Sequence, residues 1–489
     1  MATIQPVNIA TLNRVLTNKG YAIVKTSLDS ATLDIVRKEL TVSPALPVKF
    51  SANTARFCIY QESPTRIYVP KFWGISRFGP PEADTISEGL CIPMAVQFAG
   101  DPFPHQKTII QSFMENGANG LICIPCGKGK TVIAIYLAIL LGKRFLVVVD
   151  KEFLMNQWKE EISKFVKNIR IGIVQCSDRE VEVEKYDCTI CMIQTLCSQE
   201  FKDGFFKDFG FAIFDECHHL GAQHFSLVLK KIHTKHMLGL SATPDRDDGL
   251  TKVFEAFLGK PVYQESREPD PDVNVRAFWF KDDNPDYTKI PTDWRGETVL
   301  ARLMTQIVHH RPRTAKVVEK ILGLVADPLR KILVLSERRD HLEEIRAAIC
   351  GLCICGFYVG GMKQEELNEN ALKCKVLLGT YAMASEAMNI KALNSMVMAS
   401  PRKRVEQSTG RILRVSPENR DVQPVIIDII DQHEIYVHQW YQRQKYYKKC
   451  QYNITHEGAG DSKKGGSSGH ASAELEQAIA SRCMIVTGH

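Results

Sequence analysis

Two regions of the chain, residues 97–263 and 312–432, alternate apolar runs of strand length with amphipathic segments of helix length. The run at 143–150 is apolar through its centre, which is typical of a strand buried on both faces. Residues 153–162 follow with apolar side chains at helical spacing. Alternation of strands and helices along a chain is typical of parallel sheets with helices on both faces. The pattern therefore predicts two α/β domains in tandem.

The regions around these two domains have other patterns. Residues 1–96 show short alternating runs, at 57–60 and 66–71, separated by breaks rich in proline and glycine. This is typical of a small α+β domain, and it carries no catalytic pattern. Residues 264–311 lack the strand–helix alternation and are rich in Asp, Pro and Lys. We therefore expect a linker or an exposed insertion there.

The last part of the chain, residues 433–489, begins with a segment that mixes aromatic and basic side chains. Its members are Tyr436, Trp440, Tyr441, Arg443, Lys445, Tyr446, Tyr447, Lys448 and Lys449. One interpretation is a nucleic-acid surface, where bases stack on the rings and the cations contact phosphates. The other is a helix packed on the second α/β domain with a solvated basic face. The stretch 458–470 is rich in Gly, Ser and Lys, and we expect it to be disordered.

The composition sets limits on the class of protein. With 489 residues, of which 44% are hydrophobic and 24% charged, the chain is long enough for several domains with sizeable cores. Its net charge of +6 is compatible with nucleic acid as a partner without being evidence for it. No apolar run is long enough to cross a bilayer, and the N-terminus lacks the pattern of a secretion signal. We therefore expect an intracellular protein, nuclear or cytoplasmic, with no membrane partner.

The 15 cysteines are expected to be reduced thiols, because the chain carries no secretion signal. Cys350, Cys353 and Cys355 form a cluster, but a structural zinc site needs four ligands in a loop-rich module. Two Cys-x-x-Cys pairs fall in a strand-like run and in the glycine-rich stretch described next. Free cysteines acting as small apolar residues are therefore the favoured interpretation.

A glycine-rich stretch separates an apolar run ending at Ile124 from a second apolar run. The stretch consists of Pro125, Cys126, Gly127, Lys128, Gly129, Lys130 and Thr131. Its glycines allow backbone N–H groups to face phosphate oxygens at a helix N-terminus, which favours anions. Lys130 then suits the β- and γ-phosphates of ATP, and Thr131 suits Mg²⁺. The usual eight-residue phosphate loop begins with glycine, where this chain has Ile124.

A pair of acids follows a later apolar run, at residues 209–214. Asp215 and Glu216 stand at the carboxyl end of this predicted strand, the edge at which ligands of open α/β sheets bind. In isolation such a pair is more often a helix cap or a solvated turn. Behind a phosphate loop, it predicts a site for ATP hydrolysis.

Together these motifs resemble a superfamily 2 DExH helicase. The sequence Asp-Glu-Cys-His that ends at His218 carries the resemblance. Gln106 looks like the family's adenine-reading glutamine, and Ser241 and Thr243 match the motif that couples the two domains. The matching residues of the second region are Gly379, Thr380, Glu386, Gln407, Arg411 and Arg414. The resemblance spans residues 103–414 and implies two tandem RecA-like parallel-sheet domains with a small α+β N-terminal domain.

Within the superfamily, the chain looks nearest to the XPB-like and large-DNA-virus helicases, including the poxvirus transcript-release type. Arg246 and the two acids after it resemble an Arg-Glu-Asp element of the XPB group, and residues 67–74 are similar to the front domain of viral members. Ala387 and Asn389 depart from the Gly and Asp that motif V usually carries. The Asp-Glu-Ala-Asp tetrad of RNA-directed members is absent, which argues against that class.

The resemblance implies roles for the residues of the first domain. Lys130 would bind the phosphates, and Thr131 and Asp215 would hold Mg²⁺. Glu216 would orient the attacking water. His218 would link this site to Ser241 and Thr243, although a lone histidine is more often a satisfied core residue.

The second domain would supply positive charge to the transferring phosphoryl group. Arg411 and Arg414 would act as arginine fingers, and Gln407 would also face the γ-phosphate. A lone arginine is more often part of a surface ion pair, so this interpretation depends on the complete set of motifs.

Two classes of function are open. The first is an ATP-driven DNA helicase or translocase in transcription or repair, with ATP and Mg²⁺ as cofactors. Its partners would be DNA, with RNA less expected, and transcription or repair proteins, and residues 1–96 would engage DNA. The second is a non-processive ATPase switch or assembly subunit that grips duplex DNA or a partner without unwinding, and an RNA helicase is the remaining alternative. If the chain is viral, we expect it in the virus factory or the virion.

Overall fold

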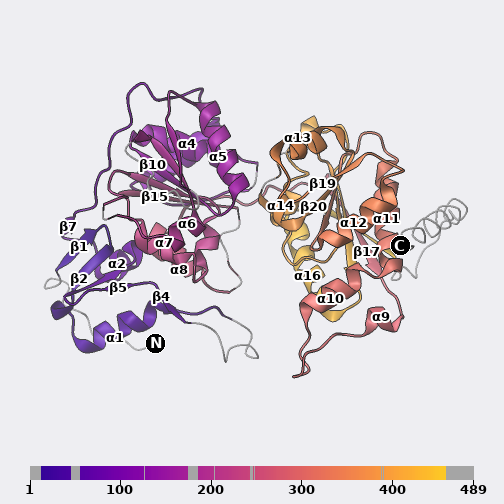
Figure 1. The fold of residues 1–489 in the computed structure, drawn as a ribbon, viewed down its shortest axis with the longest axis horizontal. Coiled ribbons are helices and arrows are strands. Elements are labelled where there is room, and N and C mark those ends of the chain that lie inside the picture. The colour runs from indigo at the N-terminus through magenta and orange to yellow at the C-terminus, as the bar shows by residue number, and fades with distance from the viewer. Residues whose placement is uncertain are drawn as a thin grey trace, which may run out of the picture. The chain divides into compact units, whose positions relative to one another are not determined.

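The computed structural model divides the chain into two compact units, Met1–Ser266 (unit 1) and Arg267–His489 (unit 2). Figure 1 shows a central sheet in each unit. The described residues are 13–45, 56–125, 127–174, 185–202, 204–242, 246, 248–386, 388 and 390–458. Several expectations concern residues outside this description. They are the sites at Cys126 and Thr243, the motif V departures at Ala387 and Asn389, the side chain of Glu386 and the tail from residue 459.

The central sheet of unit 1 has seven strands in the order β12-β13-β10-β14-β15-β9-β16, and every neighbouring pair is parallel. The strands are β9 (Asn119–Cys123), β10 (Phe145–Val149), β12 (Ile171–Val174), β13 (Cys188–Met192), β14 (Phe211–Phe214), β15 (His236–Ser241) and β16 (Pro261–Gln264). In a parallel sheet all carboxyl ends meet at one edge. The ends of β9, β14 and β15 therefore lie together, and the phosphate loop, the acid pair and the Ser241 motif follow them.

Side chains of this sheet alternate between two cores. On β9, Leu121 and Cys123 lie in one buried cluster, and Ile122 and the following Ile124 lie in the other. This is the period of two that a strand imposes. The helices α3 (Pro104–Glu115), α4 (Lys130–Leu141) and α5 (Glu152–Phe165) cover one face, and α6 (Ile193–Ser198), α7 (Ser226–Lys231) and α8 (Thr251–Leu258) cover the other.

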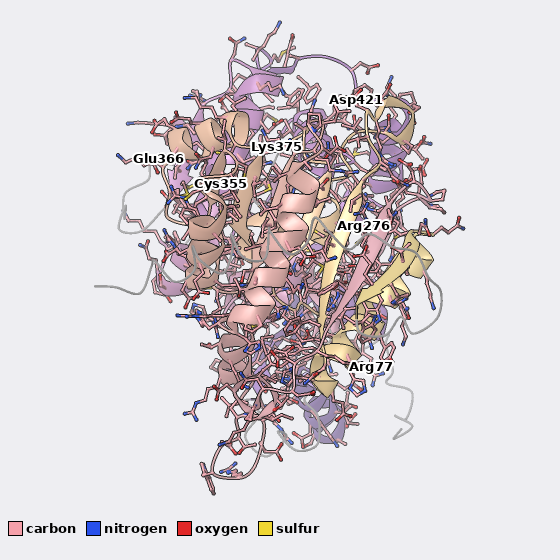
Figure 2. The ribbon with its side chains drawn as sticks, turned by 90° about the vertical axis from the view of Figure 1, so that its right-hand side faces the viewer. Arg77, Arg276, Cys355, Glu366, Lys375 and Asp421 are labelled. Atoms are coloured by element: carbon pink, nitrogen blue, oxygen red, sulfur yellow. The ribbon has the colours of Figure 1, made fainter. Side chains whose placement is uncertain are left out.

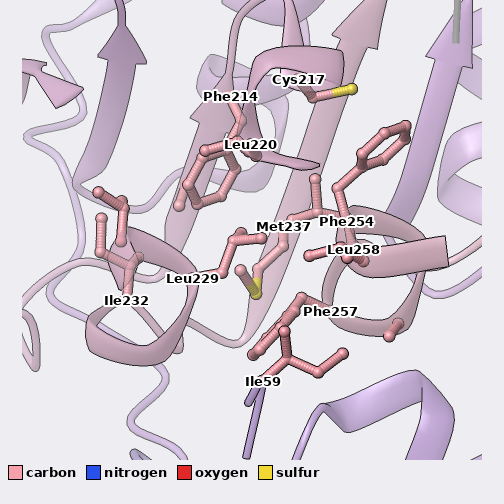
Figure 3. Packing of buried hydrophobic residues seen from close by; sticks show 14 of the residues in the cluster. Ile59, Phe214, Cys217, Leu220, Leu229, Ile232, Met237, Phe254, Phe257 and Leu258 are labelled. Atoms are coloured by element: carbon pink, nitrogen blue, oxygen red, sulfur yellow. The ribbon is translucent and has the colours of Figure 1, made fainter. Parts of the chain in front are cut away.

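The N-terminal part of unit 1 forms a five-stranded sheet in the order β5-β6-β2-β1-β7. Its elements are β1 (Arg14–Thr17), β2 (Gly20–Val24), β5 (Gln61–Glu62), β6 (Arg66–Val69), β7 (Ala83–Asp84), α1 (Ser30–Glu39) and α2 (Lys71–Phe78), and β3 (Thr41–Val42) pairs with β4 (Phe57–Cys58). Ile59 packs with Phe257 and Met237 in a cluster that this part shares with the central sheet (Figure 3). The expected α+β domain is thus present, and it shares a hydrophobic core with the first parallel-sheet domain.

Unit 2 contains a second parallel sheet of seven strands, in the order β19-β20-β18-β21-β22-β17-β23. The strands are β17 (Asn274–Phe280), β18 (Ile332–Ser336), β19 (Cys355–Tyr358), β20 (Val376–Thr380), β21 (Ser395–Met398), β22 (Val425–Asp431) and β23 (Asn453–Gly458). Helices α11 (Arg311–Val325), α12 (Arg339–Ile349) and α13 (Gln364–Lys373) connect them. Two tandem parallel-sheet domains therefore confirm the expected fold class.

The linker expected over residues 264–311 is not what the structure contains. Strand β17 lies inside the second sheet, hydrogen-bonded in parallel to β22 and β23. Figure 2 looks onto this sheet, where β17 carries Arg276 next to β22. Helices α9 (Pro285–Thr288) and α10 (Leu300–Val308) follow. The strand escaped prediction because its partners come more than 140 residues later in the chain.

The basic-aromatic segment folds as one helix, α16 (Glu434–Lys449), whose buried residues are Tyr436, Trp440, Arg443 and Tyr447. Arg443 donates two hydrogen bonds of 2.8 Å to the buried carboxylate of Asp428 on β22. Lys445, Lys448 and Lys449 lie on its exposed face. The structure therefore favours the packed helix with a solvated basic face.

Two expectations about metals and membranes can be compared with the described residues. Among them, no group of three or more His, Cys, Asp or Glu side chains could hold a metal ion. Burial raises the pKa of Cys355 to about 11, so this thiol stays protonated at neutral pH. In the same part of the chain, no helix has both the length and the apolar composition to span a membrane.

Candidate active site of unit 1

The phosphate loop joins β9 to α4 with two glycines in left-handed conformations. The φ angles of Gly127 and Gly129 are 91° and 83°, values that L side chains rarely adopt. A Cβ atom on Gly129 would also lie 2.4 Å from Nε2 of Gln106. The backbone conformation therefore favours glycine at residue 129, and a larger residue there would also displace the amide of Gln106, the predicted adenine-reading glutamine.

Gln106 is buried and held at the start of α3. Its Oε1 accepts a hydrogen bond of 3.0 Å from the backbone N–H of Phe103. This contact caps the helix and leaves the side-chain amide next to the phosphate loop. The structure thus brings together two motifs that are separated by about twenty residues in the sequence.

Lys130 is the first residue of α4, and Thr131 follows it. The ammonium group of Lys130 donates to the carbonyl of Ile124, at the beginning of the loop, over 3.3 Å. Lys128 pairs with Glu265 over 3.1 Å, after the edge strand β16. The cation predicted to bind phosphates is therefore held over the loop that would surround them.

Asp215 follows β14, and both of its carboxylate oxygens accept hydrogen bonds. The indole N–H of Trp158 donates to Oδ2 over 2.8 Å, and the backbone N–H of Glu216 donates to Oδ1 over 3.0 Å. Glu216 has a φ of 42°, which is uncommon for a residue with a side chain. Such backbone strain occurs where the surrounding structure fixes a functional side chain.

The acid pair is electrostatically unequal. Burial raises the pKa of Asp215, and the neighbouring Glu216 carboxylate raises it further. Burial also acts on Glu216, but the charge of Lys130 and the hydrogen bond with His218 outweigh it and lower its pKa. Two adjacent carboxylates, of which Glu216 is buried, lie beside one lysine and leave an excess of negative charge, which a divalent cation would offset.

These residues fit Mg²⁺. The carboxylate of Asp215 and the hydroxyl of Thr131 are the hard oxygen donors that this ion prefers. Mg²⁺ is usually bound by one or two protein groups together with substrate phosphates, so a large protein ligand cluster is not needed. When bound, the ion would neutralise charge on the phosphates of ATP.

His218 connects the acid pair to β15. Its Nδ1 lies 3.3 Å from Oε2 of Glu216 and 3.1 Å from Oγ of Ser241. The carbonyl of Ser241 accepts a hydrogen bond of 3.1 Å from the N–H of Ile124. The path Glu216–His218–Ser241–Ile124 thus runs from the acid pair back to the phosphate loop.

Arg246 supports this path from the segment after β15. Its Nη1 donates to the carbonyl of His218 over 2.6 Å, and its guanidinium forms an ion pair with Asp248. Next to His218, burial lowers the pKa of His219 to about 4, so the His219 ring is neutral at pH 7. Arg246 therefore contacts the backbone of His218 directly.

In unit 2, the predicted motifs V and VI lie against each other. Gly379 and Thr380 end β20. Gln407 lies on the short helix α15 (Glu406–Thr409), at the start of motif VI.

The arginines of motif VI converge on the chain after motif V. Arg411 is buried, and it donates to the carbonyls of Ala384 and Met388 over 2.5 and 3.0 Å. Arg414 also donates to the carbonyl of Met388, over 2.9 Å. Both candidate fingers are thus hydrogen-bonded to backbone within their own unit.

Comparison with known proteins agrees with this geometry. Residues 100–246 match the family described as "Type III restriction enzyme, res subunit". A protein of Acanthamoeba polyphaga mimivirus, named "Putative ATP-dependent RNA helicase", is 32% identical over 453 residues, which cover 90% of this chain and 86% of the relative. The chain belongs to the superfamily 2 helicases.

Further relatives of this helicase also come from large DNA viruses. A protein of African swine fever virus with the same name is 28% identical over 358 residues, covering 67% of this chain and 68% of the relative. A structure of the S. cerevisiae protein Dbp5 bound to RNA and ADP BeF3 has a TM-score of 0.52 at 11% identity, covering 78% of this chain and 94% of that one. That likeness concerns the fold alone. The mimivirus relative and the family match confirm the expected helicase family, which implies the use of ATP.

Trp158 is the site residue that sequence reasoning missed. It lies on the apolar face of α5 with Leu154, Met155 and Ile162, so its spacing identified it only as a core residue. The available signal was chemical, because a buried indole N–H needs a hydrogen-bond acceptor. Helix α5 follows β10, and β10 pairs with β14. The acceptor of the Trp158 N–H is therefore the carboxylate of Asp215, at the end of β14.

Proposed function

We propose that this helicase is a Mg²⁺-dependent ATPase that moves along or unwinds DNA, in transcription or repair, in a large DNA virus. The observation that carries the proposal is the path Glu216–His218–Ser241–Ile124. It joins the acid pair, which would respond to the γ-phosphate, to the end of a central strand. A change at the nucleotide can therefore alter the position of the chain after β15.

Each residue of unit 1 has a defined task in this proposal. Lys130 leaves the carbonyl of Ile124 and binds the phosphates of ATP. Mg²⁺ would be held by Thr131 and by Asp215, which Trp158 orients. Glu216 stays ionised because Lys130 and His218 lower its pKa, so that it can accept a hydrogen bond from the attacking water.

The arginines of unit 2 complete the site in this proposal. Arg411 and Arg414 exchange the carbonyls of Ala384 and Met388 for phosphate oxygens, and Gln407 contacts the γ-phosphate. Neither unit contains both a phosphate loop and arginine fingers in its motifs. Hydrolysis would therefore require the two units to meet, and nucleic acid bound by both would increase the population in which they do.

RNA is the second candidate substrate, because the relatives from mimivirus and African swine fever virus are named as RNA helicases. DNA is supported by the resemblance of Arg246 and the acids after it to the XPB group. The contact of Arg246 with His218 gives that element a physical connection to the site.

The test is the rate of ATP hydrolysis with Mg²⁺ in the presence of single-stranded DNA, duplex DNA or RNA. We expect DNA to increase the rate of ATP hydrolysis by the wild type. The variants Lys130→Ala and Glu216→Gln should not hydrolyse ATP. Unchanged hydrolysis in these variants would refute the assigned site, and stimulation by RNA alone would replace the proposed substrate. Strand displacement measured beside triplex displacement then separates unwinding from translocation and from a static switch.

A further inference from the structure

The segment between α9 and α10 carries an exposed tryptophan at the tip of a closed turn. Trp294 is 85% exposed, although tryptophan has one of the largest apolar surfaces of any side chain. Figure 1 shows this segment extending beyond both helices. Burying such a ring in another molecule would be favourable, so its exposure here calls for a binding role.

Hydrogen bonds close the turn and hold its shape. The N–H of Asp293 donates to the carbonyl of Glu297 over 2.9 Å, and that of Gly296 donates to the carbonyl of Asp293 over 3.0 Å. The carboxylate of Asp293 accepts from the N–H groups of Arg295 and Glu297 over 2.8 and 3.0 Å. Gly296 takes the left-handed φ of 79° that the turn requires. The ring is thus presented by an ordered backbone, which reduces the entropy lost on binding.

A cation lies on the exposed ring. The guanidinium carbon of Arg295 is 4.3 Å from the centroid of Trp294, within the range of a cation–π interaction. The remaining surface of the indole faces solvent. The tip therefore offers a flat aromatic surface and a positive charge side by side.

We infer that Trp294 and Arg295 form a stacking site for an unpaired nucleobase. Every base has a π-face that one aromatic ring can cover, and a neighbouring arginine can contact the phosphate next to it. This inference rests on the proposed function, because it assigns a contact to the nucleic acid on which the helicase acts.

A protein partner fits the turn less well. Protein hot spots consist of an anchor surrounded by a contiguous patch that excludes water. The neighbours of Trp294 at the tip are Asp293 and Arg295, both charged and exposed. Ile290 and Leu300 are about half exposed, at 47% and 50%, but they stand at the two ends of the loop.

The test measures the affinity of the full chain for fluorescein-labelled single strands of 20 nucleotides, one of DNA and one of RNA, by fluorescence anisotropy. Replacing a stacking ring by alanine costs about 5- to 150-fold in affinity. We expect a loss in this range for Trp294→Ala and most of the affinity to remain in Trp294→Phe, which keeps a ring. The strand whose affinity falls more, DNA or RNA, is the nucleic acid that Trp294 contacts.

The matched control is Leu372→Ala, because Leu372 is an 81% exposed apolar residue on α13 of the same unit. It should bind both strands like the wild type. The basal ATPase rate should be unchanged in every variant, since the turn lies outside the ATP site. A 2-aminopurine base in the bound strand should lose fluorescence with wild-type protein and keep it with Trp294→Ala.

Three outcomes would overturn the inference. One is wild-type affinity of Trp294→Ala for both strands, and another is an equal loss in the phenylalanine variant. The third is unaltered strand binding together with self-association that depends on Trp294 in sedimentation, which would assign the tip to a protein contact. If the wild type hydrolyses ATP and binds nucleic acid, these outcomes leave the proposed function intact; if it does neither, both proposals fail.

Discussion

The indole N–H of Trp158, on α5, donates over 2.8 Å to Oδ2 of Asp215, which follows β14. Trp158 is 1% exposed, so water does not compete for this contact. The second oxygen accepts from the N–H of Glu216. The carboxylate is therefore fixed by two donors before any cation arrives, in the way that outer partners orient metal ligands in proteins.

Trp158→Phe should weaken Mg²⁺ binding while the ring continues to fill its place in the core. Losing an outer partner that orients a metal ligand typically costs about 10- to 100-fold in metal affinity, which predicts a similar increase in the Mg²⁺ concentration needed for half-maximal hydrolysis. Binding of a fluorescent ATP analogue as a function of Mg²⁺ gives the same answer without turnover. Met155→Leu, on the same buried face, is the control. An unaltered Mg²⁺ dependence in Trp158→Phe would remove this residue from the site.

The local parts of the site follow from sequence, and the contacts between them do not. The strand, the glycines and Lys130 are consecutive in the chain, so their order predicts a phosphate loop. The contact of Trp158 with Asp215 depends on which strands are neighbours in the sheet. Strand β17 was missed for the same reason, since its pairing with β22 and β23 is long-range.

The relation between the N-terminal part and the first parallel sheet was also beyond sequence reasoning. The short strands of residues 13–84 predict a small sheet, but nothing local in them shows that Ile59 packs beside Phe257. This shared core changes how the expected DNA-engaging role should be tested. Removing residues 1–96 would expose Phe257 and Met237, so surface substitutions are the sounder approach.

Ser241→Ala should separate hydrolysis from movement. It removes the hydroxyl that lies 3.1 Å from His218 and keeps the backbone carbonyl that contacts Ile124. We expect the basal ATPase rate to stay within about fivefold of wild type, because a hydrogen bond of this kind contributes about 1 kcal/mol. The number of ATP molecules used per base pair displaced should rise. Ser112→Ala on the exposed face of α3 is the control, and an unchanged ratio in Ser241→Ala would break the proposed coupling path.

Buried neutral histidines should make unit 1 less stable in acid. Burial lowers the pKa of His233 to about 4, whereas an unfolded histidine titrates near 6.5. The unfolded chain therefore binds this proton first, and the contribution of His233 to stability is lost as the pH falls from 6.5 to 4. The loss reaches about 3 kcal/mol at pH 4.

The measurement is the free energy of unfolding in urea at several pH values between 7 and 4. His233→Asn should flatten its dependence on pH, whatever its effect at pH 7. His224→Asn is the matched control, because His224 is exposed on the same unit. An equal slope in His233→Asn and the wild type would show that this histidine does not stay neutral in the folded state.

Arg411→Ala should abolish most turnover and leave ATP binding nearly intact. The phosphate loop and the acid pair lie in unit 1, whereas Arg411 lies in unit 2, where it donates to the carbonyls of Ala384 and Met388. If Arg411 meets the transferring phosphoryl group, its loss should slow hydrolysis about 10³- to 10⁵-fold, as for other arginine fingers. Nucleotide affinity and single-turnover hydrolysis, each with and without DNA, separate these effects.

The controls must distinguish a finger from a structural arginine, because Arg411 also stabilises the chain around Met388. Arg411→Lys keeps the charge and a donating nitrogen, so it should fold like the wild type. It should still turn over slowly, since lysine cannot reproduce the planar fork of arginine. Arg339→Ala removes an exposed arginine of unit 2 that pairs with Glu343, and it should have no effect. Normal DNA-stimulated turnover in a folded Arg411→Ala protein would contradict the assignment of one ATP site to two units. The hydrolysis would then need a source of positive charge within unit 1, where Lys130 already lies beside the acid pair.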